Sequence, residues 1–377
     1  MKKTNERIVS NTHGITLIAL IITIVILIIL STVTIKIAFS DNGLIKRAEQ
    51  VKNLTEQVIT DEQENINSLF ESMEDLIQDN ENPENLEYTE YTEYTDIYVT
   101  GYLDGTLAFS STNTKLDGKE EYLEYGNVKD YEFKVTYNYD DGEGADMYTE
   151  ISANTPWIGD SKNYTTVVFV DKIVPSSVAG WFFKFESLTT IQNIENLNTE
   201  NVSDFSAMFA ECRNIASLDM SKLNTSNATN MSWMFGRCER LTTLNIKGLD
   251  TSKVTDMANM FDTCGAITNL DVSDLNTSNV EDMHGMFERC YDLQSLDLSN
   301  FNTSKVKNMS IMFAGSESLK ELNLSSFDTS KVMDMSYMFG WCTSLKSITI
   351  TKDKWVFAAG VDRTDMMTEC PAQIIEL

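Results

Sequence analysis

A Met-Phe pair recurs six times in the chain at a constant interval of 26 residues, with no insertion between copies. The pairs are Met208-Phe209, Met234-Phe235, Met260-Phe261, Met286-Phe287, Met312-Phe313 and Met338-Phe339. A fixed period of about 20–50 residues is the signature of a solenoid, in which each unit buries its apolar face against its neighbours. Residues 188–350 therefore predict six stacked repeats rather than a globular core.

Each copy predicts a short strand, a turn and a short helix. In one copy Leu293, Leu296, Leu298 and Phe301 follow the pattern L-x-x-L-x-L-x-x-L, whose period of two is typical of a strand. An Asp/Asn-Thr-Ser triplet follows as a turn. Apolar residues then recur at helical spacing, as from Val254 to Cys264. The expected fold is an α/β repeat, a leucine-rich-repeat-type solenoid with one strand and one helix per unit.

The position before each predicted helix is always Asp or Asn. These residues are Asp204, Asn230, Asp256, Asp282, Asn308 and Asp334. A helix N-cap requires a side-chain oxygen that accepts from the free N–H groups of the first turn. We therefore expect all six to be structural N-caps.

The exposed positions of the predicted strands form ladders of polar residues. One ladder is Asp219, Asn245, Asp271, Asp297 and Asn323, and its neighbours are Ser221, Lys247, Ser273, Ser299 and Ser325. Solenoids expose long concave surfaces that serve as binding sites, so these ladders predict a polar strip that binds a protein or glycan. The alternative is that the same side chains solvate the strand face and satisfy turns.

Five of the six cysteines occupy one position of the repeat, which is serine in the remaining copy. They are Cys212, Cys238, Cys264, Cys290 and Cys342, and the serine is Ser316. Closely spaced cysteine pairs are absent, and no histidine stands in phase with them, so the pattern does not predict a metal site. We expect buried free thiols that act as small apolar side chains, with a disulfide ladder as the alternative.

The N-terminal part contains 21 uncharged residues from Ile15 to Ile35. As a helix they span about 31 Å, enough to cross the hydrocarbon core of a bilayer. The preceding residues are net basic, which predicts a cytoplasmic N-terminus and an extracellular remainder. We expect a cytoplasmic leader at 1–14 and a single-pass transmembrane helix at 15–38.

The chain between this helix and the repeats divides by composition. An amphipathic pattern predicts a helical stalk over 39–79, and an acidic stretch predicts a linker over 80–96. Strand-forming segments predict a β-rich region with the N-terminal cap of the solenoid over 97–187, and residues 351–377 are expected to form the C-terminal cap. Within the β-rich region, the acidic run at 139–146 is either a hairpin turn or a calcium loop, and it lacks the complete EF-hand pattern.

Charge and composition exclude several classes of function. The formal net charge is −28, which argues against nucleic-acid binding. Only two histidines occur, and no Ser-His-Asp, Cys-His or metal constellation is present in the sequence. The sequence therefore predicts neither an enzyme nor a cofactor.

Two segments resemble known families. The run Gly14-Ile15-Thr16-Leu17-Ile18-Ala19-Leu20 resembles a type IV prepilin leader, which implies cleavage between Gly14 and Ile15. That family normally has glutamate where this chain has Ala19, which puts filament assembly in doubt.

The repeats, as in the copy from Leu322 to Val332, resemble the BspA-like leucine-rich repeat surface proteins. Together the two resemblances imply a membrane-anchored bacterial cell-surface protein that binds an extracellular protein or glycan. The lipid bilayer is then a second partner, through the N-terminal helix. The alternative is a minor pilin or pseudopilin-like component of a filament.

Overall fold

The computed structural model describes residues 95–128, 135–139 and 149–377. All of them belong to the second of two compact units, Tyr91–Leu377. The predicted transmembrane helix, the stalk, most of the acidic linker and the Gly14-Ile15 cleavage site lie outside the described residues. Within the described ranges, no helix is both long and apolar enough to cross a membrane.

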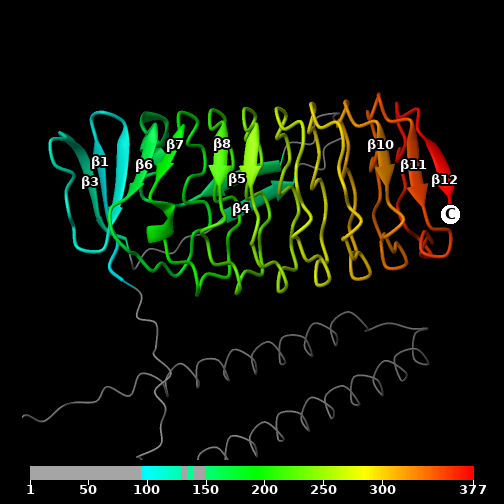
Figure 1. Ribbon diagram of the computed structural model, residues 1–377, viewed down its shortest axis with the longest axis horizontal. Coiled ribbons are helices and arrows are strands. Elements are labelled where there is room, and N and C mark those ends of the chain that lie inside the picture. Colours follow the sequence, from blue (N-terminus) through cyan, green and yellow to red (C-terminus); the bar gives the residue numbers. More distant parts are fainter. Residues whose placement is uncertain (1–94, 129–134, 140–148) are drawn as a thin grey trace, which may run out of the picture. The chain divides into compact units, whose positions relative to one another are not determined.

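The repeats form a β-solenoid of about eight turns (Figure 1). Its strands are β6 (Thr166–Phe169), β7 (Thr190–Gln192), β8 (Ser217–Asp219), β9 (Thr243–Asn245), β10 (Glu321–Asn323), β11 (Ser347–Ile350) and β12 (Gln373–Glu376). All pairs between neighbouring coils are parallel, as in Ser217 with Thr243 and Ser347 with Gln373. The predicted period of 26 residues is thus confirmed as the strand register of the solenoid.

The N-terminal end of the solenoid is continued by three more strands. These are β1 (Tyr98–Tyr102), β2 (Thr106–Ser110) and β3 (Glu121–Asn127), and the sheet order is β3-β1-β2-β6-β7. Aromatic rings fill the core behind them, with Phe109 stacked on Trp181 at 5.2 Å between ring centroids. Two short 3₁₀ helices, η1 (Ile158–Asn163) and η2 (Ile194–Asn196), connect strands in this region.

A hairpin of β4 (Val135–Tyr139) and β5 (Thr149–Ala153) packs against the first coils. Val135 and Ala153 contact a small apolar cluster that includes Phe183 and Trp233. Gly180 makes this approach possible, because a Cβ atom there would stand 2.7 Å from the Cβ of Ala153. Its φ of +63° also lies in the left-handed region that glycine tolerates best.

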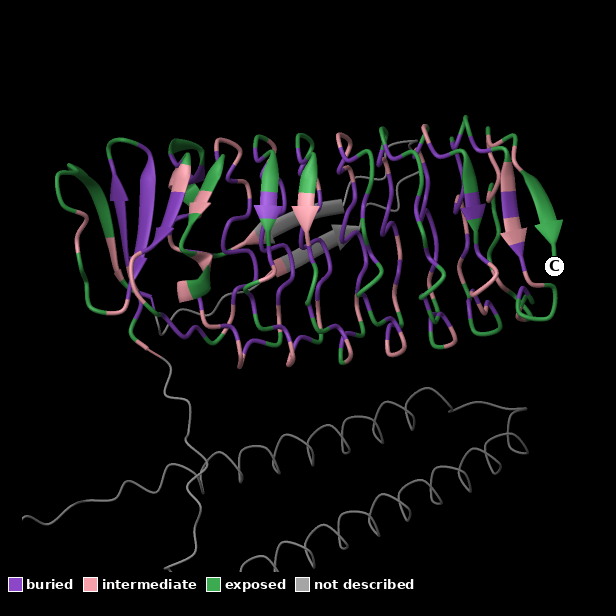
Figure 2. Cartoon of the chain, viewed as in Figure 1, coloured by how far each residue is buried: buried purple, intermediate pink, exposed green. Residues whose placement is uncertain are grey.

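Buried residues run through every coil of the solenoid (Figure 2), and their apolar side chains form a stacked column inside it. The phenylalanines of the Met-Phe pairs form one continuous stack, with centroids 5.6–6.1 Å apart and rings within 11° of parallel. Such offset aromatic pairs contribute roughly 0.5–1.5 kcal/mol each beyond the area they bury. The conserved spacing of the repeat therefore places identical rings in van der Waals contact from coil to coil.

The short helix predicted in each copy is wrong. After Asp204 the backbone N–H groups alternate: that of Ala207 donates to Ser232 of the next coil, and that of Met208 donates to Phe205 of its own coil. Ala207 and Glu211 adopt left-handed φ values of 51° and 61°. An α-helix would direct every N–H group along its own axis and leave none for the next coil.

The helical spacing was misleading because two structures share it. The left-handed residues recur four positions apart in each coil, as at 233 and 237 or 259 and 263. These successive turns direct inward the same Val, Met, Phe and Cys side chains that would lie on one face of a helix.

The repeated cysteines are buried, and all six cysteines of the chain are free thiols. Each repeated thiol donates to a phenylalanine carbonyl in the preceding coil, as from Cys264 Sγ to Phe235 O at 3.2 Å. Ser316 makes the same bond to Phe287 at 2.7 Å, which explains why serine replaces cysteine in that copy.

Residues at both ends of the predicted array continue the coil pattern. Asp362 forms a parallel bridge with Asp334, and its Oδ1 accepts the N–H of Thr364 at 2.8 Å. Strand β12 then pairs with β11 in the register of the preceding coils. Residues 351–377 therefore form a further coil.

Candidate functional site

The Asp and Asn residues of the predicted ligand-binding ladder stand at the C-terminal ends of β8, β9 and β10 and at the equivalent positions of the coils between them, and all but the half-buried Asn245 are exposed. Its members occupy equivalent positions in successive coils. Asn245 Nδ2 donates to Asp219 Oδ1 at 2.9 Å, and Lys247 Nζ stands 3.3 Å from Asp271 Oδ2. The structure thus brings the ladder residues together in one row.

Each ladder residue also closes a turn in its own coil. The Oδ1 atom accepts the backbone N–H two residues later in all five cases: Ser221 to Asp219 (3.0 Å), Lys247 to Asn245 (3.2 Å), Ser273 to Asp271 (3.2 Å), Ser299 to Asp297 (3.0 Å) and Ser325 to Asn323 (3.1 Å). This is an Asx turn, in which the side chain imitates a backbone carbonyl. One oxygen of each rung therefore has a structural role.

The turn bonds also keep the ladder charged. The Ser221 N–H lowers the pKa of Asp219, and the Ser299 N–H does the same for Asp297. Hydrogen bonds from the Ser273 hydroxyl and N–H lower the pKa of Asp271. The three carboxylates are therefore ionised and held in fixed orientations at neutral pH.

The six predicted N-caps have a related role without a helix. They form a column of parallel bridges from Asp204 to Asp334. The Oδ1 atom of each accepts the N–H two residues later at 2.8–3.0 Å. They are Asx-turn residues at a corner of the coil, and no helix follows them.

At Asp256 in this column, burial makes the charged form of the side chain unfavourable. The pKa of Asp256 is raised to about 6, mainly by desolvation and to a smaller extent by the charges of Asp282 and Asp204, although the N–H bond from Ala258 opposes the shift. The corner therefore holds a carboxylate that is destabilised when charged.

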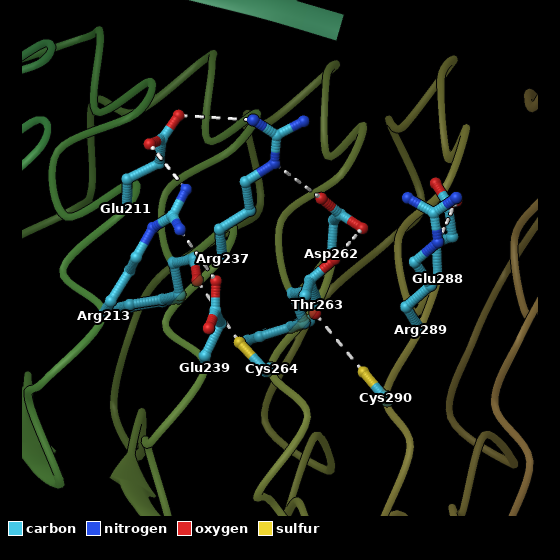
Figure 3. A network of polar contacts seen from close by, with 12 residues as sticks. Glu211, Arg213, Arg237, Glu239, Asp262, Thr263, Cys264, Glu288, Arg289 and Cys290 are labelled. Atoms are coloured by element: carbon cyan, nitrogen blue, oxygen red, sulfur yellow. Dashed lines mark hydrogen bonds and ion pairs between the residues drawn. The ribbon is translucent and has the colours of Figure 1, made fainter. Parts of the chain in front are cut away.

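A second polar row was not identified in the sequence. It crosses the turn segments of four successive coils, at the positions between each Phe and the following Cys and, in two coils, at the residue after that Cys (Figure 3). Its ion pairs join Glu211 to Arg213 (3.2 Å), Glu211 to Arg237 (3.2 Å), Arg213 to Glu239 (3.4 Å), Arg237 to Asp262 (3.7 Å) and Glu288 to Arg289 (3.4 Å). We call these residues the turn-face network.

Three acidic members of the turn-face network, Glu211, Asp262 and Glu288, are buried, whereas Glu239 is exposed. Desolvation raises the pKa of Glu288 to about 8 and that of Asp262 to about 6. Bonds from Thr263 and the charge of Arg237 oppose the shift at Asp262 without cancelling it. Arg237 also stands over the ring of Trp233, 5.3 Å from its centroid.

The sequence carried one signal for this network. The positions between Phe and Cys are Ala-Glu, Gly-Arg, Asp-Thr, Glu-Arg, Ala-Gly and Gly-Trp in the six copies, while the flanking residues hardly change. A helix would place these variable residues on its solvated face, so the predicted helix gave no reason to expect a polar network there. Across the described ranges, no group of three or more His, Cys, Asp or Glu residues is arranged to hold a metal ion.

Comparison with protein families gives one match. The family model described as "Mycoplasma protein of unknown function, DUF285" matches residues 177–293 and, in a second overlapping match, residues 264–375. The matched region, 177–375, is more than half of the chain and coincides with the coils. No curated protein and no solved structure matches.

Proposed function

Because the chain belongs to the DUF285 family, we propose that it is a membrane-anchored surface protein whose solenoid binds an extracellular protein or glycan. Regular coils of 26 residues and the family match both fit the BspA-like surface proteins that the sequence resembles. The proposal includes an anchor at residues 15–38, with the coils outside the cell. A net charge of −28 favours a partner other than nucleic acid, and we propose binding rather than catalysis.

The observation that carries the proposal is the row of fixed carboxylates on the strand face. Neighbouring strands stand about 4.8 Å apart, so the carboxylates of Asp219, Asp271 and Asp297 recur at multiples of that spacing, and asparagine amides occupy the other two rungs. One oxygen of each Asp is held in its turn, which orients the other without further loss of side-chain entropy. Regularly spaced, oriented acceptors suit an extended ligand that presents repeated donors, such as a peptide segment or a glycan chain.

Charge removal without loss of the turn tests the strand face. Asparagine keeps the Oδ1 acceptor, as Asn245 and Asn323 show. We expect the triple variant Asp219→Asn, Asp271→Asn, Asp297→Asn to lose about tenfold or more in affinity, since hydrogen bonds to charged groups contribute roughly 1.5–3 kcal/mol each. The ligand is first selected from immobilised glycans and extracellular proteins, and affinity is then measured by surface plasmon resonance.

A matched control uses the same change at another corner of the coil. Asp250 and Asp328 also close Asx turns, with Ser252 and Ser330, and their pKa values are also lowered by those serines. The double variant Asp250→Asn, Asp328→Asn should bind as the parent does. Equal affinity of the parent and the triple variant would refute binding through the strand face.

The anchor is tested separately. Mass spectrometry of the protein from isolated membranes identifies its first residue, and protease treatment of intact cells reports whether the coils are outside. Recovery of the chain only in the soluble fraction would refute the anchor and leave the binding test unaffected.

A further inference from the structure

Exposed apolar side chains gather at the two ends of the solenoid. Eleven large apolar residues stand exposed in the described part of the chain, and eight of them belong to the first or last strands and their adjoining loops. The eight are Leu103, Tyr122, Leu123, Val356, Phe357, Ile374, Ile375 and Leu377. Exposed apolar clusters of this kind mark interaction surfaces, and here both ends carry one.

The two end strands also have free edges. At one end β3 is the outermost strand, and at the other end β12 pairs with β11 on one side only among the described residues. An edge strand presents unpaired N–H and C=O groups that can accept another strand. Both β3 and β12 are mostly exposed along their lengths.

The direction of the end strands decides which pairing continues the sheet. Strand β2 runs parallel to β6, β1 runs antiparallel to β2, and β3 runs antiparallel to β1. It follows that β3 runs in the same direction as β12. A second copy shifted along the solenoid axis would therefore place its β3 beside β12 in parallel, which is the arrangement of every coil pair inside the molecule.

The chemistry of the two ends is complementary. Ile374 and Ile375 of β12 are each 46% exposed, and they would meet Tyr122 and Leu123 of β3, which are 48% and 41% exposed. Lys352, whose side chain is 74% exposed, flanks β12 beside Glu376. Exposed Glu121 and Glu124 lie along β3 and pair with Lys115, so each end pairs its charges locally and the contact between copies would rest on the apolar side chains.

We propose that copies of this chain stack head to tail, with β12 of one copy paired to β3 of the next. This contact is heterologous, because each copy contributes a different surface at its two ends. Repetition of the contact extends one continuous parallel β-solenoid through several copies, and the apolar ends are covered in all but the outermost.

Two single-site variants block the two ends separately. Ile375→Lys places a charge at the β12 end, and Leu123→Lys places one at the β3 end. Both positions are exposed, so the fold of the monomer should be retained, which circular dichroism checks. Tyr291→Lys is the matched control, because Tyr291 is 41% exposed in the middle of the array.

Analytical ultracentrifugation of the full chain in detergent measures association as a function of concentration. We expect concentration-dependent growth for the parent and for Tyr291→Lys, and at least a tenfold weaker association for each end variant. A 1:1 mixture of the end variants retains one intact β12–β3 contact and should form heterodimers but no larger species.

Other outcomes overturn the proposal. A parent chain that associates no more than the doubly blocked variant, Leu123→Lys with Ile375→Lys, would show that the ends do not pair. Association lost in Ile375→Lys but kept in Leu123→Lys would show a symmetric contact between two β12 ends instead. Growth of the mixture beyond heterodimers would place the contact elsewhere on the molecule.

Discussion

Replacement of Asp256 by asparagine should stabilise the solenoid at neutral pH. The position lies in the corner column where other coils already have Asn230 and Asn308. Asparagine keeps the Oδ1 atom that accepts the N–H of Ala258 at 2.9 Å. It removes a desolvated charge that stands between Asp204 and Asp282.

The size of the effect follows from the pKa. Folding raises the pKa of Asp256 from 3.8 to about 6, and each unit corresponds to about 1.4 kcal/mol. The cost of the charged side chain at pH 7 is therefore at most about 3 kcal/mol, and we expect a gain of about 1–3 kcal/mol for Asp256→Asn.

The stability gained by Asp256→Asn should change with pH in a direction that the raised pKa determines. Below pH 3.8 the carboxyl is protonated in both states, so the charge penalty vanishes there. A raised pKa in the folded state means that the contribution of Asp256 to parent stability falls as pH rises from about 4 to 6, and is then constant. The gain of the variant should therefore be small at pH 3.5, increase between pH 4 and 6, and level off above pH 6.

Urea unfolding followed by tryptophan fluorescence measures the free energy of unfolding at pH 3.5, 5 and 7. Asp297→Asn is the control, because the pKa of Asp297 is lowered rather than raised, so loss of its charge should give no gain at pH 7. An Asp256→Asn chain no more stable than the parent at pH 7, or equally stabilised at all three values, would refute the reasoning.

Changes at three further residues test the core and the turn-face network. Cys264→Ser should keep the bond to the Phe235 carbonyl, as Ser316 keeps the equivalent bond in its own coil. Cys264→Ala should cost about 0.5–1.5 kcal/mol, because that carbonyl loses one of its two donors and keeps only the N–H of Cys238; denaturant unfolding compares the two variants. Phe261→Ala interrupts the ring stack and should cost about 3–5 kcal/mol in the same assay, and a loss below 1 kcal/mol would contradict tight packing there. Glu288→Gln should stabilise the chain increasingly from pH 5 to 8 and by a constant amount above, because burial raises the pKa of Glu288 to about 8 and the parent loses stability over the range in which only the unfolded chain is ionised there. Melting temperatures that differ by the same amount at pH 5 and 9 would argue against this.

Sequence reasoning succeeded where one physical cause explains the pattern. The constant interval between Met-Phe pairs could only be kept by stacked units, and the structure has the same register between β10 and β11. Burial of the repeated cysteines followed from the serine in one copy and from the absence of metal-ligand spacing, and the structure shows free, buried thiols.

Sequence reasoning failed where two structures share a period. Apolar residues from Val254 to Cys264 fit a helix, but they also fit successive turns with left-handed residues at Asn259 and Thr263. The two structures differ in their backbone hydrogen bonds to the next coil, and the spacing of apolar residues within one copy gives no information about those bonds. The same error concealed the turn-face network, because Asp262 would have been a solvated residue on a helix and is buried in the solenoid.

Backbone hydrogen bonds in the segment after each corner alternate between two partners, and this alternation restricts which insertions and deletions the gene can accept. In every coil, the N–H groups of alternate residues in this segment donate to carbonyls of the next coil, as from Phe209 to Met234. The N–H groups of the residues between them donate within their own coil, as from Ala210 to Ala207. An insertion or deletion of one residue would exchange the two sets and leave the donors of the whole segment facing the wrong partners. Duplication or loss of a complete 26-residue unit preserves every bond. The molecule is therefore expected to vary in length among relatives by whole coils, so that the length of the solenoid changes in steps.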